Sequence, residues 1–227
     1  MISAPILRAA VSLALLWGWQ YWAAVSMLGF LGMLHLAEFL ALRRRDLVLP
    51  GDSLQHHTVV YVHVRHPKTA RFARRQHAKI EDALIVRYIE MVYGGFSLDA
   101  KLFPGSASVY RRQWDRIMDR LEIPHTRKHR GATPAVLRGS GATHLYLATE
   151  DIQLIQWRGR WTKLKTVEYY LQEVAAQVIL HQLNELARHR IEFLSEHSSA
   201  LVCHVIADAE AQRSRIGEMD DDDKIHA

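Results

Sequence analysis

The sequence predicts a mainly α-helical protein with a small antiparallel β-hairpin or sheet, that is, an α+β fold. Several segments carry apolar residues at helical spacing, whereas residues 58–64, TVVYVHV, alternate β-branched and aromatic side chains as a strand does. Turn-forming glycine and proline residues separate these segments. With 227 residues, the chain has the length of one domain with appendages.

The predicted elements follow one another along the whole chain, with a turn at VLPGDS, residues 48–53. In order, they are helices over 5–27 and 30–45, strands over 58–64 and 71–80, and helices over 81–94, 106–123, 134–148, 151–161 and 174–194. The two strands are joined by a tight basic turn and therefore form a hairpin.

The first two helices come from a long apolar run. Residues 9–34 include no charged side chain, are long enough to span a bilayer, and are followed by three arginines at 43–45. Gly18 and Gln20 interrupt the run, and the mean hydropathy of the chain is only −0.11. We therefore expect two buried core helices, with a membrane span as the alternative.

Capping residues mark the ends of the later helices. A Gly-Gly pair ends the helix over 81–94, and Ser106 or Ser108 caps the helix over 106–123. Pro134 begins the next helix, and Gly159 breaks the one after it. The tail from Ala209 is polar and acidic, so we expect it to be disordered.

The charge of the chain favours a polyanionic partner. Lysine and arginine number 29 against 24 acidic residues, giving a net charge of +5, and the acidic residues concentrate in EMDDDDK at 218–224. The remaining body is thus more basic than the total indicates, as in nucleic-acid-binding proteins. Cys203 is the one cysteine, which excludes an internal disulfide and a cysteine-based metal site and fits a nuclear or cytoplasmic location.

Residues 133–174, TPAVLRGSGATHLYLATEDIQLIQWRGRWTKLKTVEYYLQEV, carry the strongest motif. Trp161 lies 23 residues after Arg138, and Tyr170 lies nine residues after Trp161. This block resembles the C-terminal half of the catalytic domain of the tyrosine recombinases, or phage integrases, a Cre-like family related to type IB topoisomerases. The resemblance implies the fold of that domain.

Two upstream segments extend the resemblance. GMLHLAEFLALRRRDL at 32–47 is similar to the first family box, and RHPKTARFARR at 65–75 is similar to the hairpin that carries a catalytic lysine. The family's separate N-terminal DNA-clamping domain is expected to be absent. The domains expected are an N-terminal lead at 1–8, a catalytic domain at 9–185, a helical extension at 186–208 and the acidic tail at 209–227.

The resemblance implies DNA strand cleavage and rejoining through a 3′-phosphotyrosine intermediate. It assigns the nucleophile to Tyr170, a phosphate clamp to Arg138 and the general acid to Lys68. Trp161 would steer a non-bridging oxygen through its indole N–H. This chemistry uses neither a metal nor a small-molecule cofactor, and the histidines show no metal-ligand spacing.

Two positions depart from the family pattern. His35 replaces an arginine three residues before Glu38, and Ala135 replaces a histidine three residues before Arg138. A largely neutral histidine cannot make the arginine fork, and alanine supplies no polar group. Losing one preorganised charge-stabilising group costs about 10² to 10³ in rate. These substitutions predict that strand cleavage is weakened or lost.

The expected partner is double-stranded DNA. The basic side chains expected to contact it are Arg43, Arg44, Arg71, Arg74, Arg75, Arg127, Lys128, Arg130, Arg160 and Lys163. The helix after the tyrosine would join a homo-oligomer, a tetramer on DNA, or else pack on its own core. Two alternatives to a recombinase remain: a catalytically inactive DNA-binding remnant of a mobile element, and a membrane-anchored helical protein.

Overall fold

The computed structural model describes residues 1–53, 58–65, 77–126, 131–171 and 173–225. The α-helices of these residues are α1 (Ala4–Leu16), α2 (Gln20–Leu31), α3 (Leu36–Ala41), α4 (Ala83–Tyr93), α5 (Ala107–Arg120), α6 (Val136–Thr149), α7 (Ile152–Gly159), α8 (Leu164–Tyr170), α9 (Glu173–Gln182), α10 (Glu185–Glu196) and α11 (Ser198–Ile225). Short 3-10 helices are η1 (Arg44–Asp46) and η2 (Pro50–Asp52). The fold is mainly helical with a small antiparallel sheet, which confirms the predicted class.

The sheet has three strands in the order β1 (Leu47–Val48), β2 (Val60–His63) and β3 (His77–Ile80). Both pairs are antiparallel, and Val60 pairs with Ile80. Val60 and Val62 are buried while their neighbours are more exposed, which is the alternation predicted for 58–64. The strand β1 was not predicted, because two residues are too short to show a period.

Helices α1 and α2 lie in the centre of the molecule. The helix α1 packs against α10, α11 and α2, and α2 packs against α6 and α4. Trp22, on α2, is 1% exposed and stacks on Tyr110 of α5 with ring centroids 5.5 Å apart. The apolar run at 9–34 therefore forms core helices, and in the described residues no helix has both the length and the apolar character needed to cross a membrane.

The predicted helix over 5–27 is wrong, because the chain breaks at Gly18. This glycine has a φ of 73°, a left-handed conformation that favours glycine, and the amide of Trp19 returns to the carbonyl of Ala14 at 2.7 Å. The predicted helix over 30–45 is also interrupted. Met33 has a φ of 47°, so α2 ends and the short α3 starts anew after His35.

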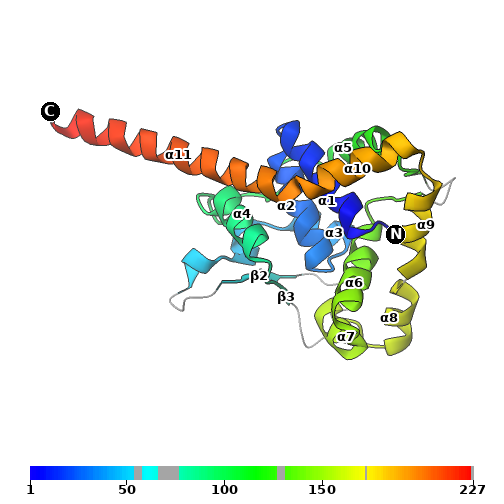
Figure 1. The fold of residues 1–227 in the computed structure, drawn as a ribbon. Helices are drawn as coiled ribbons and strands as arrows, with labels where there is room; N and C mark the ends of the chain where they lie inside the picture. The colour runs from blue at the N-terminus through cyan, green and yellow to red at the C-terminus, as the bar shows by residue number, and fades with distance from the viewer. Residues whose placement is uncertain (54–57, 66–76, 127–130, 172, 226–227) are drawn as a thin grey trace.

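The C-terminal segment differs from its prediction at two points. The helix expected over 174–194 is split into α9 and α10, because Asn184 caps α10 through its side chain, which accepts from the amide of Ala187 at 2.8 Å. The tail expected to be disordered is helical as far as Ile225 (Figure 1). Near its start this tail is attached to α4, since Arg213 donates to the carbonyl of Met91 at 2.7 Å.

The helices α6, α7 and α8 form a group at one end of the molecule, around a small apolar cluster of their own (Figure 1). Met33, Ala142, Ile155 and Val167 make up the buried part of this cluster. Because Met33 precedes α3, the cluster joins the turn between α2 and α3 to the three helices that carry the recombinase-like motif.

Candidate functional site

Arg138, Trp161 and Tyr170 lie in contact with one another. The guanidinium carbon of Arg138 is 4.5 Å from the centroid of the Trp161 ring. The rings of Trp161 and Tyr170 have centroids 5.3 Å apart, with an angle of 34° between their planes. Three residues spaced over 32 positions of the sequence are thus brought into one row, a cation followed by two aromatic rings.

The turn at the end of α7 places Trp161. Arg160 adopts a left-handed conformation with a φ of 61°, and the amide of Trp161 donates to the carbonyl of Gln156 at 3.0 Å. A Cβ on Gly159 would lie 1.8 Å from the Trp161 ring, so a side chain at 159 is incompatible with this ring position. Gly159 and Arg160 together fold the indole back onto its own helix.

Tyr170 ends α8 and is held from α6. The hydroxyl of Thr143 donates to the carbonyl of Tyr170 at 3.2 Å. A Cβ added at Gly139 would lie 3.0 Å from the Tyr170 ring. Because glycine has no Cβ, the ring can approach α6 closely. Tyr169 stands edge-on to Tyr170 and is 73% exposed, whereas Tyr170 is half-buried.

Arg138 is 6% exposed, and its charge has few direct partners. Its Nη1 and Nη2 donate to the carbonyls of Met33 and Gly159, while its Nε is buried without a hydrogen-bond partner. Burial, followed by the nearby charge of Arg160, lowers the pKa of Arg138 to about 10. The side chain is therefore still a cation at neutral pH.

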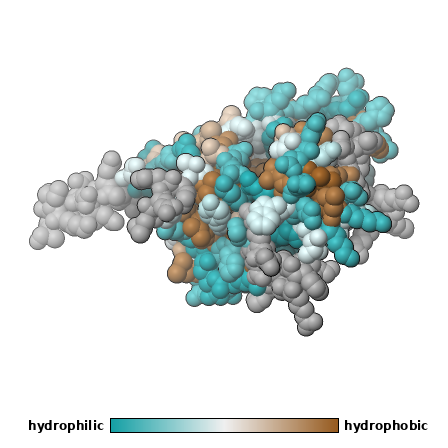
Figure 2. Space-filling model, turned by 90° about the horizontal axis from the view of Figure 1, so that it is seen from below, coloured by the Kyte–Doolittle hydropathy of each residue, from teal (hydrophilic) through white to brown (hydrophobic). Residues whose placement is uncertain are grey.

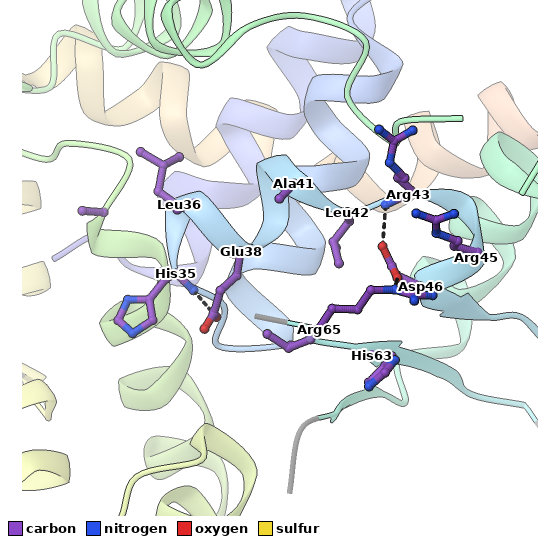
Figure 3. A pocket seen from close by; sticks show the side chains of 13 residues that line it. His35, Leu36, Glu38, Ala41, Leu42, Arg43, Arg45, Asp46, His63 and Arg65 are labelled. Carbon is purple, nitrogen blue, oxygen red and sulfur yellow. Dashed lines mark hydrogen bonds and ion pairs between the residues drawn. The ribbon is translucent and has the colours of Figure 1, made fainter. Parts of the chain in front are cut away.

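His35 and Ala135 lie together at a neighbouring cleft of about 680 Å³. His35 precedes α3, and its amide donates to the Glu38 carboxylate at 2.8 Å (Figure 3). Ala135 precedes α6 and presents no polar side-chain atom. The structure thus brings the two departing positions to one cleft, bordered by the α3 segment and the end of β2.

Basic side chains at this cleft are paired with carboxylates. Arg45 forms an ion pair with Asp99, and Arg65 forms one with Asp46. Arg43 donates through its side chain to the carbonyl of Asp99. Its amide donates to Asp46 (Figure 3). The cleft is therefore rich in charge of both signs, and an anion that entered it would compete with Asp46 and Asp99.

Two arginines expected at the DNA surface are buried instead. Arg44 is 5% exposed and donates to the carbonyl of Tyr93 at 3.0 Å and to Asp52 at 2.5 Å, so it fastens the turn around η2. Arg160 is 7% exposed and pairs with Glu38. Lys163, which precedes α8, is exposed as expected.

Several predicted residues fall outside the described part of the chain. They are Lys68, Arg71, Arg74, Arg75, Arg127, Lys128 and Arg130. The general acid and most of the expected phosphate contacts thus have no described position.

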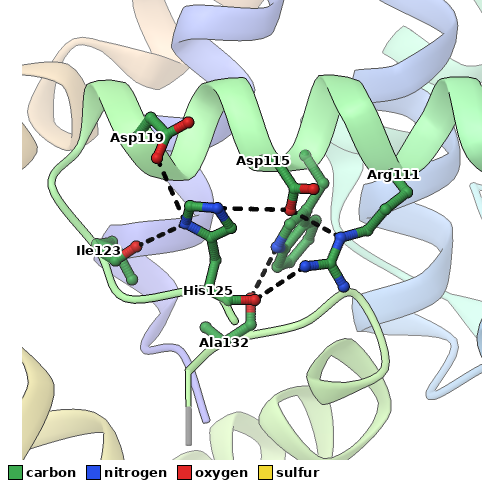
Figure 4. Close-up of polar contacts among 7 residues, drawn as sticks. Arg111, Asp115, Asp119, Ile123, His125 and Ala132 are labelled. Atoms are coloured by element: carbon green, nitrogen blue, oxygen red, sulfur yellow. Dashed lines mark hydrogen bonds and ion pairs between the residues drawn. The ribbon is translucent and has the colours of Figure 1, made fainter. Parts of the chain in front are cut away.

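A second polar cluster holds the segment before α6. His125 lies between two carboxylates of α5, with Nε2 3.7 Å from Asp115 and Nδ1 3.6 Å from Asp119. Arg111 donates to Asp115 at 2.7 Å and to the carbonyl of His125 at 2.9 Å (Figure 4). The indole of Trp114 donates to the carbonyl of Ala132 at 2.7 Å. The residues on both sides of positions 127–130 are therefore held to α5.

Sequence reasoning missed the residues that hold the site without carrying charge. Four residues, Met33, Gly139, Thr143 and Gly159, shape the row of side chains, and their close contacts leave no periodic signal in the sequence.

The face seen from below in Figure 2 mixes hydrophilic side chains with apolar patches. Trp157 of α7 is a large apolar side chain that reaches the surface, with 61% exposure.

In the described part of the chain, no three histidine, cysteine or acidic side chains are grouped to hold a metal ion. Comparison of the chain with protein-family models, curated proteins and solved structures found no match in any of the three.

Proposed function

We propose that this chain is a DNA-binding domain of the tyrosine-recombinase type, in which strand cleavage by Tyr170 is weakened or lost. The observation that supports it is the contact row of Arg138, Trp161 and Tyr170. A cation, an indole donor and a phenol at one place are the groups that phosphodiester exchange without a metal requires.

In the proposed reaction, the Tyr170 hydroxyl oxygen attacks a DNA phosphorus atom. The new bond joins Tyr170 Oη to phosphorus, and the bond from phosphorus to the 5′ oxygen breaks. The phenol proton passes to water, and the leaving 5′ oxygen takes up a proton from an acid, the role that the resemblance assigns to Lys68. Arg138 stabilises the charge that develops on the non-bridging oxygens. Attack by a 5′ hydroxyl reverses the step and frees Tyr170.

The same geometry also gives reasons why strand cleavage by Tyr170 would be slow or absent. At positions 35 and 135, which both line the cleft, a histidine and an alanine replace the arginine and the histidine of the family pattern. Arg138 is buried with its two terminal nitrogens bonded to backbone carbonyls. A phosphate must therefore compete with these carbonyls or bind at Nε.

The burial of Arg138 favours a second candidate function, that of a DNA-binding protein that does not cleave DNA. In that case the exposed basic side chains, such as Lys163, hold the DNA backbone, and the motif residues serve packing. The two candidates differ in one product, the covalent link between protein and DNA.

The test is a denaturing-gel assay with nicked suicide duplexes drawn from random and genomic pools. In such duplexes the cleaved end diffuses away, so that even slow cleavage accumulates a protein–DNA adduct. We expect a weak adduct that disappears in Tyr170→Phe and persists in Tyr169→Phe, the matched control one residue away. If the wild-type chain shifts DNA in a native gel but forms no adduct, strand cleavage is lost and the binding candidate stands; a chain that neither shifts DNA nor forms an adduct contradicts both candidates.

A further inference from the structure

A cavity of about 230 Å³ lies among five helices, away from the candidate site described above. Its walls come from α1, α2, the start of α4, α6 and the start of α11. It shares no lining residue with the row of Arg138, Trp161 and Tyr170 or with the cleft at His35. The cavity is therefore a separate place at which a ligand could bind.

Buried apolar side chains form much of the cavity wall. Leu7 of α1, Met27 and Phe30 of α2, and Val202 of α11 line it, and each of them is at most 6% exposed. An apolar group that enters the cavity leaves water for this apolar surface, which is favourable. The wall thus selects a ligand with an apolar body.

Two opposite charges, Arg8 of α1 and Asp82 at the start of α4, also line the cavity. Arg8 donates through Nε to the hydroxyl of Ser195 at 3.0 Å, and Asp82 Oδ1 accepts from the amide of Ile85 at 3.0 Å. Within the described residues, Arg8 Nη1 and Nη2 and Asp82 Oδ2 make no hydrogen bond, and neither side chain forms an ion pair. One cationic and one anionic group are thus open to a ligand.

His144 of α6 lies near both charges. Burial, followed by the charge of Arg8, lowers the pKa of His144, whereas the charge of Asp82 raises it. The His144 ring in turn has its centroid 5.5 Å from that of Phe30, on the apolar wall. Arg8 and Asp82 therefore lie near the same ring, although they are beyond ion-pair distance from each other.

The size of the cavity limits the ligand. Pockets for drug-sized molecules enclose about 300–1,000 Å³, and an apolar cavity of about 150 Å³ holds one benzene molecule. A cavity of about 230 Å³ therefore fits an aromatic or branched side chain together with a small head group. A free amino acid with an apolar side chain has this size and carries one charge of each sign.

We propose that this cavity binds a single α-amino acid with a large apolar side chain, whose carboxylate contacts Arg8 and whose ammonium group contacts Asp82. The apolar side chain of the ligand packs on the wall formed by Met27, Phe30 and Val202. Because α11 supplies part of this wall, a bound amino acid fastens α11 to the core helices. The site goes beyond the proposed function and does not depend on it.

The direct test is calorimetric titration of the full chain with L-leucine and L-phenylalanine at low ionic strength. Three compounds each lack one feature of leucine: 4-methylpentanoate has no ammonium group, 3-methylbutylamine has no carboxylate, and glycine has no apolar body. We expect both amino acids to bind and the three compounds to bind several-fold more weakly. The difference is several-fold and not larger because Arg8 and Asp82 are exposed, so solvent screens their charges. Absence of binding by both amino acids, or equal binding of leucine and any of the three, overturns the proposal.

Two variants assign the charged contacts. Arg8→Gln should lose the preference for leucine over 3-methylbutylamine and keep the preference over 4-methylpentanoate. Asp82→Asn should do the reverse, and it keeps a side-chain oxygen that can cap α4. A residue that only supports the fold weakens all ligands alike, so unchanged preferences in the two variants overturn the assignment.

The matched control is Arg87→Gln. Arg87 is an exposed arginine of α4 that pairs with Glu210 and does not line the cavity, so the affinity for leucine should not change. A loss of affinity in this variant equal to that in Arg8→Gln would mean that only the overall charge of the protein matters, which contradicts the proposal.

The outcomes separate this inference from the proposed function. A chain that binds leucine but forms no DNA adduct keeps the amino-acid site while strand cleavage is lost. A chain that forms the adduct but binds neither amino acid keeps the cleavage proposal and rejects the amino-acid site.

Discussion

The guanidinium carbon of Arg138 lies 4.5 Å from the ring centroid of Trp161. A cation over an indole face is attracted by the ring quadrupole, and burial strengthens this attraction because water screens it less. The stack explains how Arg138 can be held in the interior although its Nη atoms donate to the uncharged carbonyls of Met33 and Gly159. It also makes the position of the indole decisive for the whole row.

The first prediction concerns the glycine beneath that indole. Gly159→Ala places a Cβ 1.8 Å from the Trp161 ring, so the ring must move. Overpacking of this kind costs about 1–3 kcal/mol, although alanine is otherwise the better helix former. We expect the free energy of unfolding in urea to fall by that amount. Gly95→Ala is the control, because a Cβ there meets no atom within 4 Å.

The observation that would contradict this account is an unchanged urea midpoint in Gly159→Ala together with an unchanged tryptophan fluorescence spectrum of the folded protein. Such a result would mean that the ring occupies another position in solution. A loss of stability that also occurs in Gly95→Ala would point to the glycine substitution itself and not to the indole.

The fold class followed from the sequence because helix caps and periodicity act locally. Ser106 caps α5 by accepting the amide of Val109 at 3.3 Å, and Gly94 follows the last residue of α4, both as predicted. The breaks were harder to predict. Met33 adopts a positive φ although it is not a glycine, and its carbonyl is held by arginines more than 100 positions away.

The candidate site, like the fold, could be predicted only in part from the sequence. The resemblance singled out Arg138, Trp161 and Tyr170, and the structure brings these three side chains into contact. The burial of Arg160 against Glu38 could not be predicted, because an arginine at a helix end is ordinarily a solvated side chain. Only tertiary packing decides which arginine faces water.

The second prediction concerns acid stability through Asp52. The hydrogen bond from Arg44, at 2.5 Å, lowers the pKa of Asp52 below its usual value of about 3.9. A carboxylate whose folded pKa is depressed contributes stability above the unfolded pKa, and this contribution is lost as the pH falls through the folded pKa. Asp52→Asn should therefore be less stable than wild type at pH 7, with the difference shrinking below about pH 4.

The measurement is the free energy of unfolding in urea between neutral pH and acid for both proteins. The effect will be modest, because the Asp52 side chain is 35% exposed and solvent screens the pair. Asp99→Asn is the control, since Asp99 is 77% exposed in its ion pair with Arg45 and such pairs contribute little. Parallel pH curves for wild type and Asp52→Asn would contradict the prediction.

The third prediction concerns the contact of Arg116, on α5, with two indole rings of the turn between α1 and α2. The guanidinium carbon of Arg116 lies 5.3 Å from the Trp17 ring centroid and 5.8 Å from that of Trp19. Exposed cation–π contacts contribute about 0.5–1 kcal/mol each. Arg116→Gln should lower the free energy of unfolding by that order, while Arg116→Lys should lose less. Equal losses in both variants would show that the contact is not electrostatic.

The fourth prediction concerns the attachment of the segment before α6. Arg111→Met removes the donor that links Asp115 of α5 to the carbonyl of His125. The Arg111–Asp115 ion pair is only partly buried and solvent screens it, so the urea midpoint should change only slightly. Local opening should rise, because one side of the loop loses its hydrogen bond to α5.

Hydrogen exchange at two amides reports this opening directly. Gly131 donates to the carbonyl of Thr126 at 2.8 Å, and Ala132 donates to that of Pro124 at 2.7 Å, so both amides are protected only while these hydrogen bonds hold. Their exchange should accelerate several-fold in Arg111→Met. Arg112→Met is the matched control, because Arg112 is the exposed neighbour on the same helix. Equal exchange in both variants would mean that Trp114, through Ala132, holds the loop without Arg111.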